Sequence, residues 1–324
     1  MSTDSAGIGR TGAGRRRAAH TRRVTPLQRY IAEEIATDHA DGLLTRREAL
    51  RRLVLLGIGS AAAAALLAAC RTERTATDAP VTSTGPATVT APPGADTALP
   101  TLPVSWAGPR GELQGAWAEA PGARGGVLVV HENKGLTDWV RSVAGRFAGI
   151  GYSALAVDLL SGHGGTASFD DPARATAVLG TTPAADLVAD LRSGIAELGR
   201  RVPNRRLAAV GFCMGGGLVW QLLAAGAAEL AAALPFYGPC PDDADFSGSK
   251  DVAVLAFYGS LDRRVNATLT FARAALERAG MVYDLVTETD ADHAFFNDTG
   301  PRYNPAAAAD AWRRSTDWLA RYVG

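Results

Sequence analysis

Cys213 lies in the hexapeptide GFCMGG, at residues 211–216, where glycines surround a potential nucleophile. The strand-like run RRLAAV precedes it and the helix-forming run GGLVWQLLAAG follows it, which predicts a strand-to-helix turn. Glycines at such a turn leave room for a side chain on a strained backbone, and a nearby base can ionise a thiol there. For this motif alone, the alternative is a small buried cysteine that only fills the core.

Two residues that could assist a thiol follow later strand-like runs. Asp262 comes directly after VAVLAF, and His293 comes after YDLVTE. Because reactive groups of a parallel sheet gather at the carboxyl ends of its strands, we expect a triad in the chain order Cys213, Asp262, His293. His293 would accept the thiol proton and Asp262 would orient the imidazole. Taken separately, Asp262 could merely cap a helix near Val265, and His293 could be a surface turn residue.

The elements that must position these residues alternate along residues 104–324. Short β-like runs such as GVLVVH, YSALAVD and LAAVGF are separated by helical ones. This order predicts the α/β class, with a mostly parallel, doubly wound sheet flanked by helices. The segment SWAGPRGELQGAWAEA predicts a hairpin at the start of the domain.

The first part of the chain differs in charge and composition. Residues 1–69 carry 11 Lys+Arg against 6 Asp+Glu, although the whole chain has no net charge. In residues 45–70 the twin arginine Arg46-Arg47 precedes the uncharged run LVLLGIGSAAAAALLAAC, which resembles a twin-arginine export signal. The run ends on Leu67-Ala68-Ala69-Cys70, which is similar to a bacterial lipobox with Cys70 as the lipidated residue. An uncleaved transmembrane helix is the alternative.

Residues 1–44 form an N-terminal leader extension, in which LQRYIAEEIATDHADGLL could be a short amphipathic helix of no assigned role. Residues 71–103 are rich in Thr, Pro and Ala and lack large apolar clusters, which predicts a disordered tether. We therefore expect a protein that is exported and anchored on the extracytoplasmic face of a bacterial membrane, through lipidated Cys70 or an uncleaved signal helix.

The motifs HENKGL, DLL, GFCMGG, YGSLD and HAFFNDTGPRYN occur in that order. Together they resemble the dienelactone hydrolase (carboxymethylenebutenolidase) family, which implies the α/β-hydrolase fold and hydrolysis of small esters or lactones through a thioester. The resemblance implies that Glu132 accepts the thiol proton as substrate enters; a salt bridge from Glu132 to Lys134 is the alternative. We expect the backbone N–H groups of Met214 and Asn133 to stabilise the oxyanion.

The resemblance is weaker for the substrate. Family members that open dienelactones hold the substrate carboxylate with two arginines, and the corresponding positions here are Gly162 and Asn297. This departure argues against a dienelactone and leaves ester or lactone hydrolysis intact. Possible substrate contacts are His163, Phe295, Asn297, Arg302 and Trp139, with Arg263 and Phe296 as further candidates; for Trp139 and Phe296, core packing is the alternative.

No metal or cofactor is expected, because the sequence has no HExxH or CxxC motif and the glycines are explained by the turn at Cys213. Cys240 is expected to be a free thiol. The expected partner is a small ester or lactone, without nucleic acid, and the protein is expected to be a monomer. The alternative function is an exported lipoprotein that uses the hydrolase fold as a non-catalytic binding module.

Overall fold

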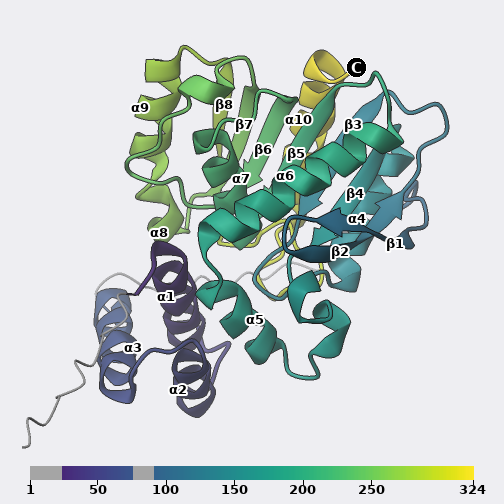
Figure 1. The fold of residues 1–324 in the computed structure, drawn as a ribbon. Helices are drawn as coiled ribbons and strands as arrows, with labels where there is room; N and C mark the ends of the chain where they lie inside the picture. The colour runs from purple at the N-terminus through teal and green to yellow at the C-terminus, as the bar shows by residue number, and fades with distance from the viewer. Residues whose placement is uncertain (1–23, 76–90) are drawn as a thin grey trace, which may run out of the picture.

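The computed structural model describes residues 24–75 and 91–324, and its centre is an eight-stranded sheet (Figure 1). The strand order is β1-β2-β4-β3-β5-β6-β7-β8. β1 and β2 are antiparallel to their neighbours, and all the other strands run parallel. The strands are β1 Leu102–Gly108, β2 Gly111–Ala118, β3 Gly125–Val130, β4 Tyr152–Asp158, β5 Leu207–Phe212, β6 Leu230–Phe236, β7 Ala253–Gly259 and β8 Tyr283–Glu288. The predicted hairpin and the mostly parallel sheet are confirmed.

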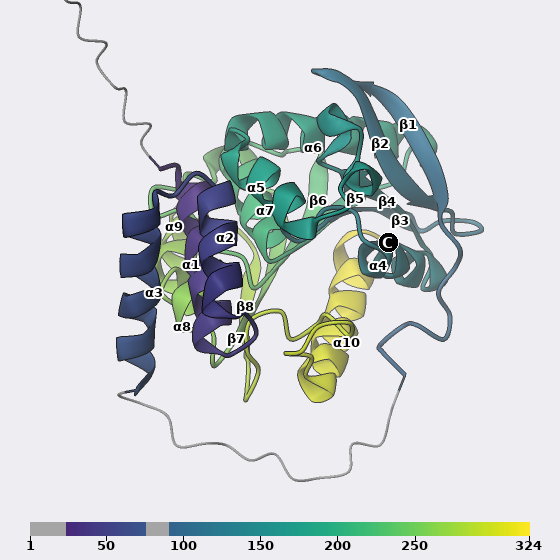
Figure 2. The ribbon, with the colours of Figure 1, turned by 90° about the horizontal axis from the view of Figure 1, so that it is seen from below.

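Helices cover both faces of the sheet, as the continuous apolar strands require. α4 and α10 pack on one face and α6 and α7 on the other (Figure 2). All residues of β3, β4, β5, β6 and β7 are buried, so these strands form the core. The helices are α4 Asp138–Gly149, α5 Pro172–Thr181, α6 Ala184–Arg201, α7 Met214–Ala224, α8 Arg263–Asn266, α9 Leu269–Ala279 and α10 Pro305–Tyr322, with short 3-10 turns η1 Ser161–His163, η2 Thr166–Ser168 and η3 Ser247–Ser249.

Three further helices precede the sheet: α1 Pro26–Ala40, α2 Arg46–Leu55 and α3 Ser60–Thr75. α1 starts at a capping box, in which the Thr25 hydroxyl accepts the Gln28 N–H and the Gln28 side chain accepts the Thr25 N–H. The three helices pack on one another, and α1 and α2 also contact α5 (Figures 1 and 2). Residues expected to form a leader of no assigned role therefore lie against the main domain.

The apolar run at residues 53–70 is divided between two helices. α2 ends at Leu55 and α3 begins at Ser60, and between them Gly57 has a φ of 86°, which favours glycine. Among the described residues, no helix combines the length and the hydropathy needed to cross a bilayer.

The predicted disordered tether, residues 71–103, is only partly described, and the described parts differ from the prediction. Residues 71–75 belong to α3, and residues 76–90 lie outside the described residues. Residues 91–101 follow the surface of the domain: the Leu99 N–H donates to the Gly145 carbonyl of α4 over 2.9 Å, and Gly94 lies against the Trp312 ring. Composition could not show these contacts, because a backbone hydrogen bond and a glycine under a ring leave no hydrophobic pattern.

Candidate active site

Cys213 lies between β5 and α7 with a φ of 55° and a ψ of −117°. This strained backbone is held by neighbours that leave no room for side chains. A Cβ on Gly211 would lie 2.2 Å from the Gly215 carbonyl oxygen, and one on Gly215 would lie 2.4 Å from the Val130 carbonyl oxygen. The glycines of the hexapeptide therefore allow the turn to press against β3 while it presents the thiol at the end of β5.

Asp262 and His293 meet beside this turn, although they follow different strands. Asp262 begins α8 after β7, and the Nδ1 of His293 lies 2.6 Å from its Oδ2. The two side chains are about 5% exposed. Burial alone would lower the pKa of His293, but the charge and hydrogen bond of Asp262 hold this pKa above its ordinary value. Asp262 also caps α8 by accepting the Val265 N–H, so the capping alternative and the contact with His293 coexist.

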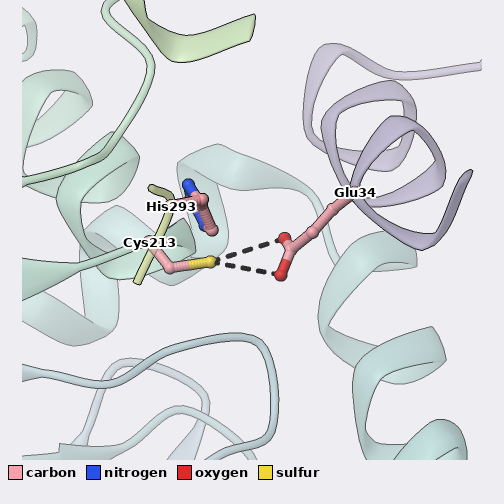
Figure 3. Close-up of side chains that lie close together, drawn as sticks. All are labelled: Glu34, Cys213 and His293. Carbon is pink, nitrogen blue, oxygen red and sulfur yellow. Dashed lines mark hydrogen bonds between the residues drawn. The ribbon is translucent and has the colours of Figure 1, made fainter. Parts of the chain in front are cut away.

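The other ring nitrogen of His293, Nε2, is buried and has no hydrogen-bond partner within residues 24–75 and 91–324. A ring nitrogen of His293, the Cys213 sulfur and a carboxylate oxygen of Glu34 all lie within 4.8 Å of one another (Figure 3). With Nδ1 donating to Asp262, Nε2 is the acceptor nitrogen, as a base for the thiol requires. Among the described residues, these three atoms also form a group that could hold a metal ion.

Two side chains from α1 contact the thiol, and the sequence analysis did not include them. The Cys213 sulfur lies 3.4 Å from the Tyr30 hydroxyl and donates to the Glu34 carboxylate, over 3.4 and 3.6 Å (Figure 3). Burial, followed by the negative charges of Glu34 and Glu132, raises the pKa of Cys213 well above its ordinary value. Cys213 is 2% exposed, so the thiol is covered.

Glu132 was expected to be the carboxylate that contacts the thiol, and its hydrogen bonds go elsewhere. One carboxylate oxygen accepts the Asn297 side-chain amide over 2.8 Å, and the other accepts the Tyr237 hydroxyl over 3.5 Å. Burial raises the pKa of Glu132, against the opposing effects of Lys134 and Asn297. In this structure the carboxylate next to the sulfur belongs to Glu34.

The two residues expected to form the oxyanion site lie close to the turn. Met214 is the first residue of α7, where backbone N–H groups have no partner within the helix. Asn133 is buried in the loop that follows β3. Since β3 and β5 are neighbouring parallel strands, both residues lie at the same edge of the sheet.

The remaining candidate substrate residues fall into different environments. Trp139 is buried and donates its indole N–H to Asp298 over 2.7 Å, and Phe295 is buried with its ring 5.4 Å from that of Tyr237. His163 is exposed in η1. Arg302 binds Asp38 and Asp41 of the α1 region and lies 3.4 Å from Asp292.

The aromatic residues for which core packing was the alternative do pack in the core. The Trp139 ring meets Phe212 edge to face at 5.1 Å, and Phe296 stacks on Phe212 at 5.5 Å. Cys240 is a buried free thiol, and burial raises its pKa to about 12.

The sequence did contain a signal for α1. The capping box of Thr25 and Gln28 starts a helix, and Leu27, Ile31 and Ile35 repeat at helical spacing. These features identify an amphipathic helix, but they do not show which surface it covers.

Comparisons with known proteins identify the family of the chain. The model of the dienelactone hydrolase family matches residues 113–323. The chain is 33% identical over 210 residues to a Salmonella typhimurium protein named "Putative carboxymethylenebutenolidase", covering 61% of this chain and 77% of that protein. A solved structure named "Putative Dienelactone Hydrolase", from Klebsiella pneumoniae, matches with 27% identity and a TM-score of 0.61, over 68% of this chain and 99% of the other.

A solved dienelactone hydrolase-like promiscuous phosphotriesterase from metagenomic libraries is also similar. It has 25% identity and a TM-score of 0.61, over 70% of this chain and all of the other. The family model alone spans more than half of the sequence, and the fold of the solved structures is the one found here. The chain therefore belongs to the dienelactone hydrolase family and is an ester or lactone hydrolase with the α/β-hydrolase fold.

Proposed function

We propose that the chain hydrolyses small esters or lactones with Cys213 as nucleophile, His293 as base and Asp262 as the residue that orients His293. One observation carries the proposal: Asp262 fixes Nδ1 of His293 at 2.6 Å, Nε2 is buried without a partner among the described residues, and a ring nitrogen of His293 lies within 4.8 Å of the thiol sulfur. That arrangement favours transfer of the thiol proton to His293 once a substrate is bound.

The reaction has two halves. The Cys213 proton passes to Nε2 of His293, the thiolate attacks the substrate carbonyl carbon, and the N–H groups of Met214 and Asn133 stabilise the oxyanion. Collapse of this intermediate breaks the ester C–O bond, and the alkoxide takes the proton from His293, leaving a thioester. A water then gives its proton to His293 and attacks the thioester, after which the thiol is reprotonated and the acid is released.

The residues around the site favour an uncharged acyl group. Neither position expected to carry a carboxylate-binding arginine does so: Gly162 is exposed at η1, and Asn297 holds Glu132. Glu132 adds negative charge near the sulfur. A substrate carboxylate would be repelled there, so we propose neutral esters or plain lactones as substrates rather than dienelactones.

The test compares wild type with Cys213→Ala and with Cys240→Ala, which removes a second buried thiol that lies outside the triad. We expect Cys213→Ala to abolish hydrolysis of p-nitrophenyl acetate and Cys240→Ala to retain it. Mass spectrometry after rapid quenching should find an acyl group on Cys213. Equal hydrolysis by wild type and Cys213→Ala, measured after removal of the residues before 91 so that α1 does not cover the thiol, would contradict the proposed nucleophile. A panel with a dienelactone and plain lactones would rank the substrates.

We also propose that residues 45–70 direct export and that Cys70 carries a lipid anchor. The support is the sequence pattern, together with the exposure of Arg46 and Arg47 at the start of α2. Expression in a bacterial host followed by mass analysis should show a mature protein that begins at lipidated Cys70. A Cys70→Ser variant should keep residues 1–69. A wild-type protein that keeps its first residues and gains no lipid would contradict this assignment.

A further inference from the structure

We propose that the end of the sheet that carries Cys213 is a binding surface for the chain's own helix α1, which blocks the site until cleavage before Cys70 releases it. The inference rests on the proposed function, because it assigns a regulator to that catalytic site. In this view residues 24–69 act as an inhibitory segment of the precursor, and the catalytic domain becomes accessible only after processing.

The first argument is steric. The Glu34 carboxylate lies 3.4 Å from the Cys213 sulfur, and the Tyr30 hydroxyl lies at the same distance. A carbonyl carbon poised for attack must itself lie within about 3–3.5 Å of the nucleophile. Glu34 and Tyr30 therefore occupy space that a substrate needs, and Cys213 is only 2% exposed with α1 in place. Substrate and α1 exclude one another.

The second argument is electrostatic. An anionic carboxylate beside a thiol disfavours the thiolate. Burial is the largest cause of the raised pKa of Cys213, and the charge of Glu34 is the second largest. The bound helix thus holds the sulfur in its protonated, weakly nucleophilic form as well as covering it. Departure of α1 would remove this charge and much of the burial together.

The third argument is that α1 is attached by specific contacts. The Arg264 guanidinium, from α8 directly after Asp262, lies 4.3 Å from the centre of the Tyr30 ring and donates to the Tyr30 carbonyl over 3.5 Å. Arg302, which follows the loop of His293, forms ion pairs with Asp38 at 2.8 Å and with Asp41. The anchoring cations therefore lie close in sequence to Asp262 and to His293.

Apolar and polar contacts continue along the neighbouring α5. Ile31 of α1 and Leu56 after α2 are fully buried, and both pack at Gly180 of α5. Arg51 of α2 forms an ion pair with Asp171, the N-cap of α5, at 2.7 Å. Charged groups of α1 and α2 thus face opposite charges on the domain, and their apolar groups face apolar ones. A segment that rested there by chance would not show this complementarity.

The position of Cys70 in the chain explains how α1 could be released from the surface that it covers. Cys70 lies in α3, after α1 and α2, whereas the chain rejoins the domain at residues 91–101. Cleavage before Cys70 would separate the blocking helix from the catalytic domain and leave the domain with its tether. The family match covers residues 113–323, and the Klebsiella pneumoniae structure is 99% covered by 68% of this chain. The catalytic body shared with these proteins does not include α1.

The experiment uses the full chain with a site-specific protease sequence introduced within residues 76–90. The folded protein is cleaved there, the N-terminal fragment is removed by gel filtration at high salt, and two rates are measured before and after. The first rate is alkylation of Cys213 by iodoacetamide, located by mass spectrometry. The second is hydrolysis of p-nitrophenyl acetate. We expect both rates to rise at least about tenfold after cleavage, because molecules in which α1 covered Cys213 then become reactive.

Point variants of the uncleaved chain complete the test. Glu34→Gln and Tyr30→Ala should each raise the alkylation rate of Cys213, whereas Glu33→Gln, a neighbouring glutamate on α1, should leave it unchanged. Rapid alkylation of the intact wild type, unaltered by cleavage and by both variants, would overturn the inference. Alkylation that rises on cleavage without any hydrolysis would support α1 as a cover and contradict the proposed catalytic function instead.

Discussion

A substitution at Asp262 tests how the base His293 is oriented without changing the nucleophile Cys213. We expect Asp262→Asn to lower ester hydrolysis by roughly a thousandfold or more, because an amide can hold His293 in the wrong tautomer. The negative charge of Asp262 also raises the pKa of His293, and a base must be unprotonated to act. Losing that charge should therefore move the acidic limb of the pH–rate profile to lower pH.

The control for this variant is Asp290→Asn, on the exposed turn after β8. Asp290 has a φ of 53°, which asparagine tolerates, so the backbone should be undisturbed. Both variants are compared with wild type after removal of the N-terminal fragment. An Asp262→Asn enzyme with an unshifted profile and near wild-type rate would show that another group orients the imidazole.

At the scale of single residues, the sequence predicted those site residues whose place is marked by a local pattern. Cys213, Asp262 and His293 were identified from their places after strand-like runs, and the structure brings all three to one point. Glu34 and Tyr30 were missed, because their meeting with Cys213 depends on how a distant helix docks. Glu34 and Cys213 are 179 positions apart in the sequence, and no pattern between them indicates that they meet.

At the scale of elements, the turn between β5 and α7 depends on close backbone approach. A Cβ on Gly215 would lie 2.4 Å from the Val130 carbonyl oxygen, whereas a Cβ on Gly199 of α6 would meet only Leu207 at 3.7 Å. We expect Gly215→Ala to reduce the free energy of unfolding by about 1–3 kcal/mol, through strain against β3. Gly199→Ala should raise it by about 0.5–1 kcal/mol, through helix propensity.

Urea unfolding followed by circular dichroism measures both changes. Equal stabilities for the two variants would mean that the turn can move away from β3, contrary to the packing described here. Because the strained residue Cys213 lies on this turn, any Gly215→Ala protein that folds should also react more slowly with esters. The pattern of glycines predicted the turn. Only the folded structure shows that the turn packs against the carbonyl of Val130.

At the scale of the whole molecule, N-terminal and C-terminal parts of the chain meet at one arginine. Arg302 follows the loop of His293, is mostly buried, and binds Asp38 and Asp41 from the opposite end of the sequence. Arg302 was expected to be a possible substrate contact, and in this structure it binds acidic residues at the end of α1 and lies 3.4 Å from Asp292. No role could be assigned to the leader extension, residues 1–44, for the same reason, since composition does not reveal long-range ion pairs.

Arg302→Gln tests whether this junction controls access without altering the charge next to the sulfur. Loss of two partly buried ion pairs should weaken α1 docking by about 1–2 kcal/mol, which corresponds to roughly a tenfold rise in the open fraction. Alkylation of Cys213 in the uncleaved chain should accelerate by a similar factor, and Arg205→Gln, on an exposed turn before β5, should leave it unchanged. After removal of the N-terminal fragment, wild type and Arg302→Gln should react alike, because Arg302 then has no helix to hold. A difference that persists after cleavage would instead place Arg302 in the structure of the catalytic loop itself, and the docking of α1 would have to depend on Arg264 and the apolar contacts with α5.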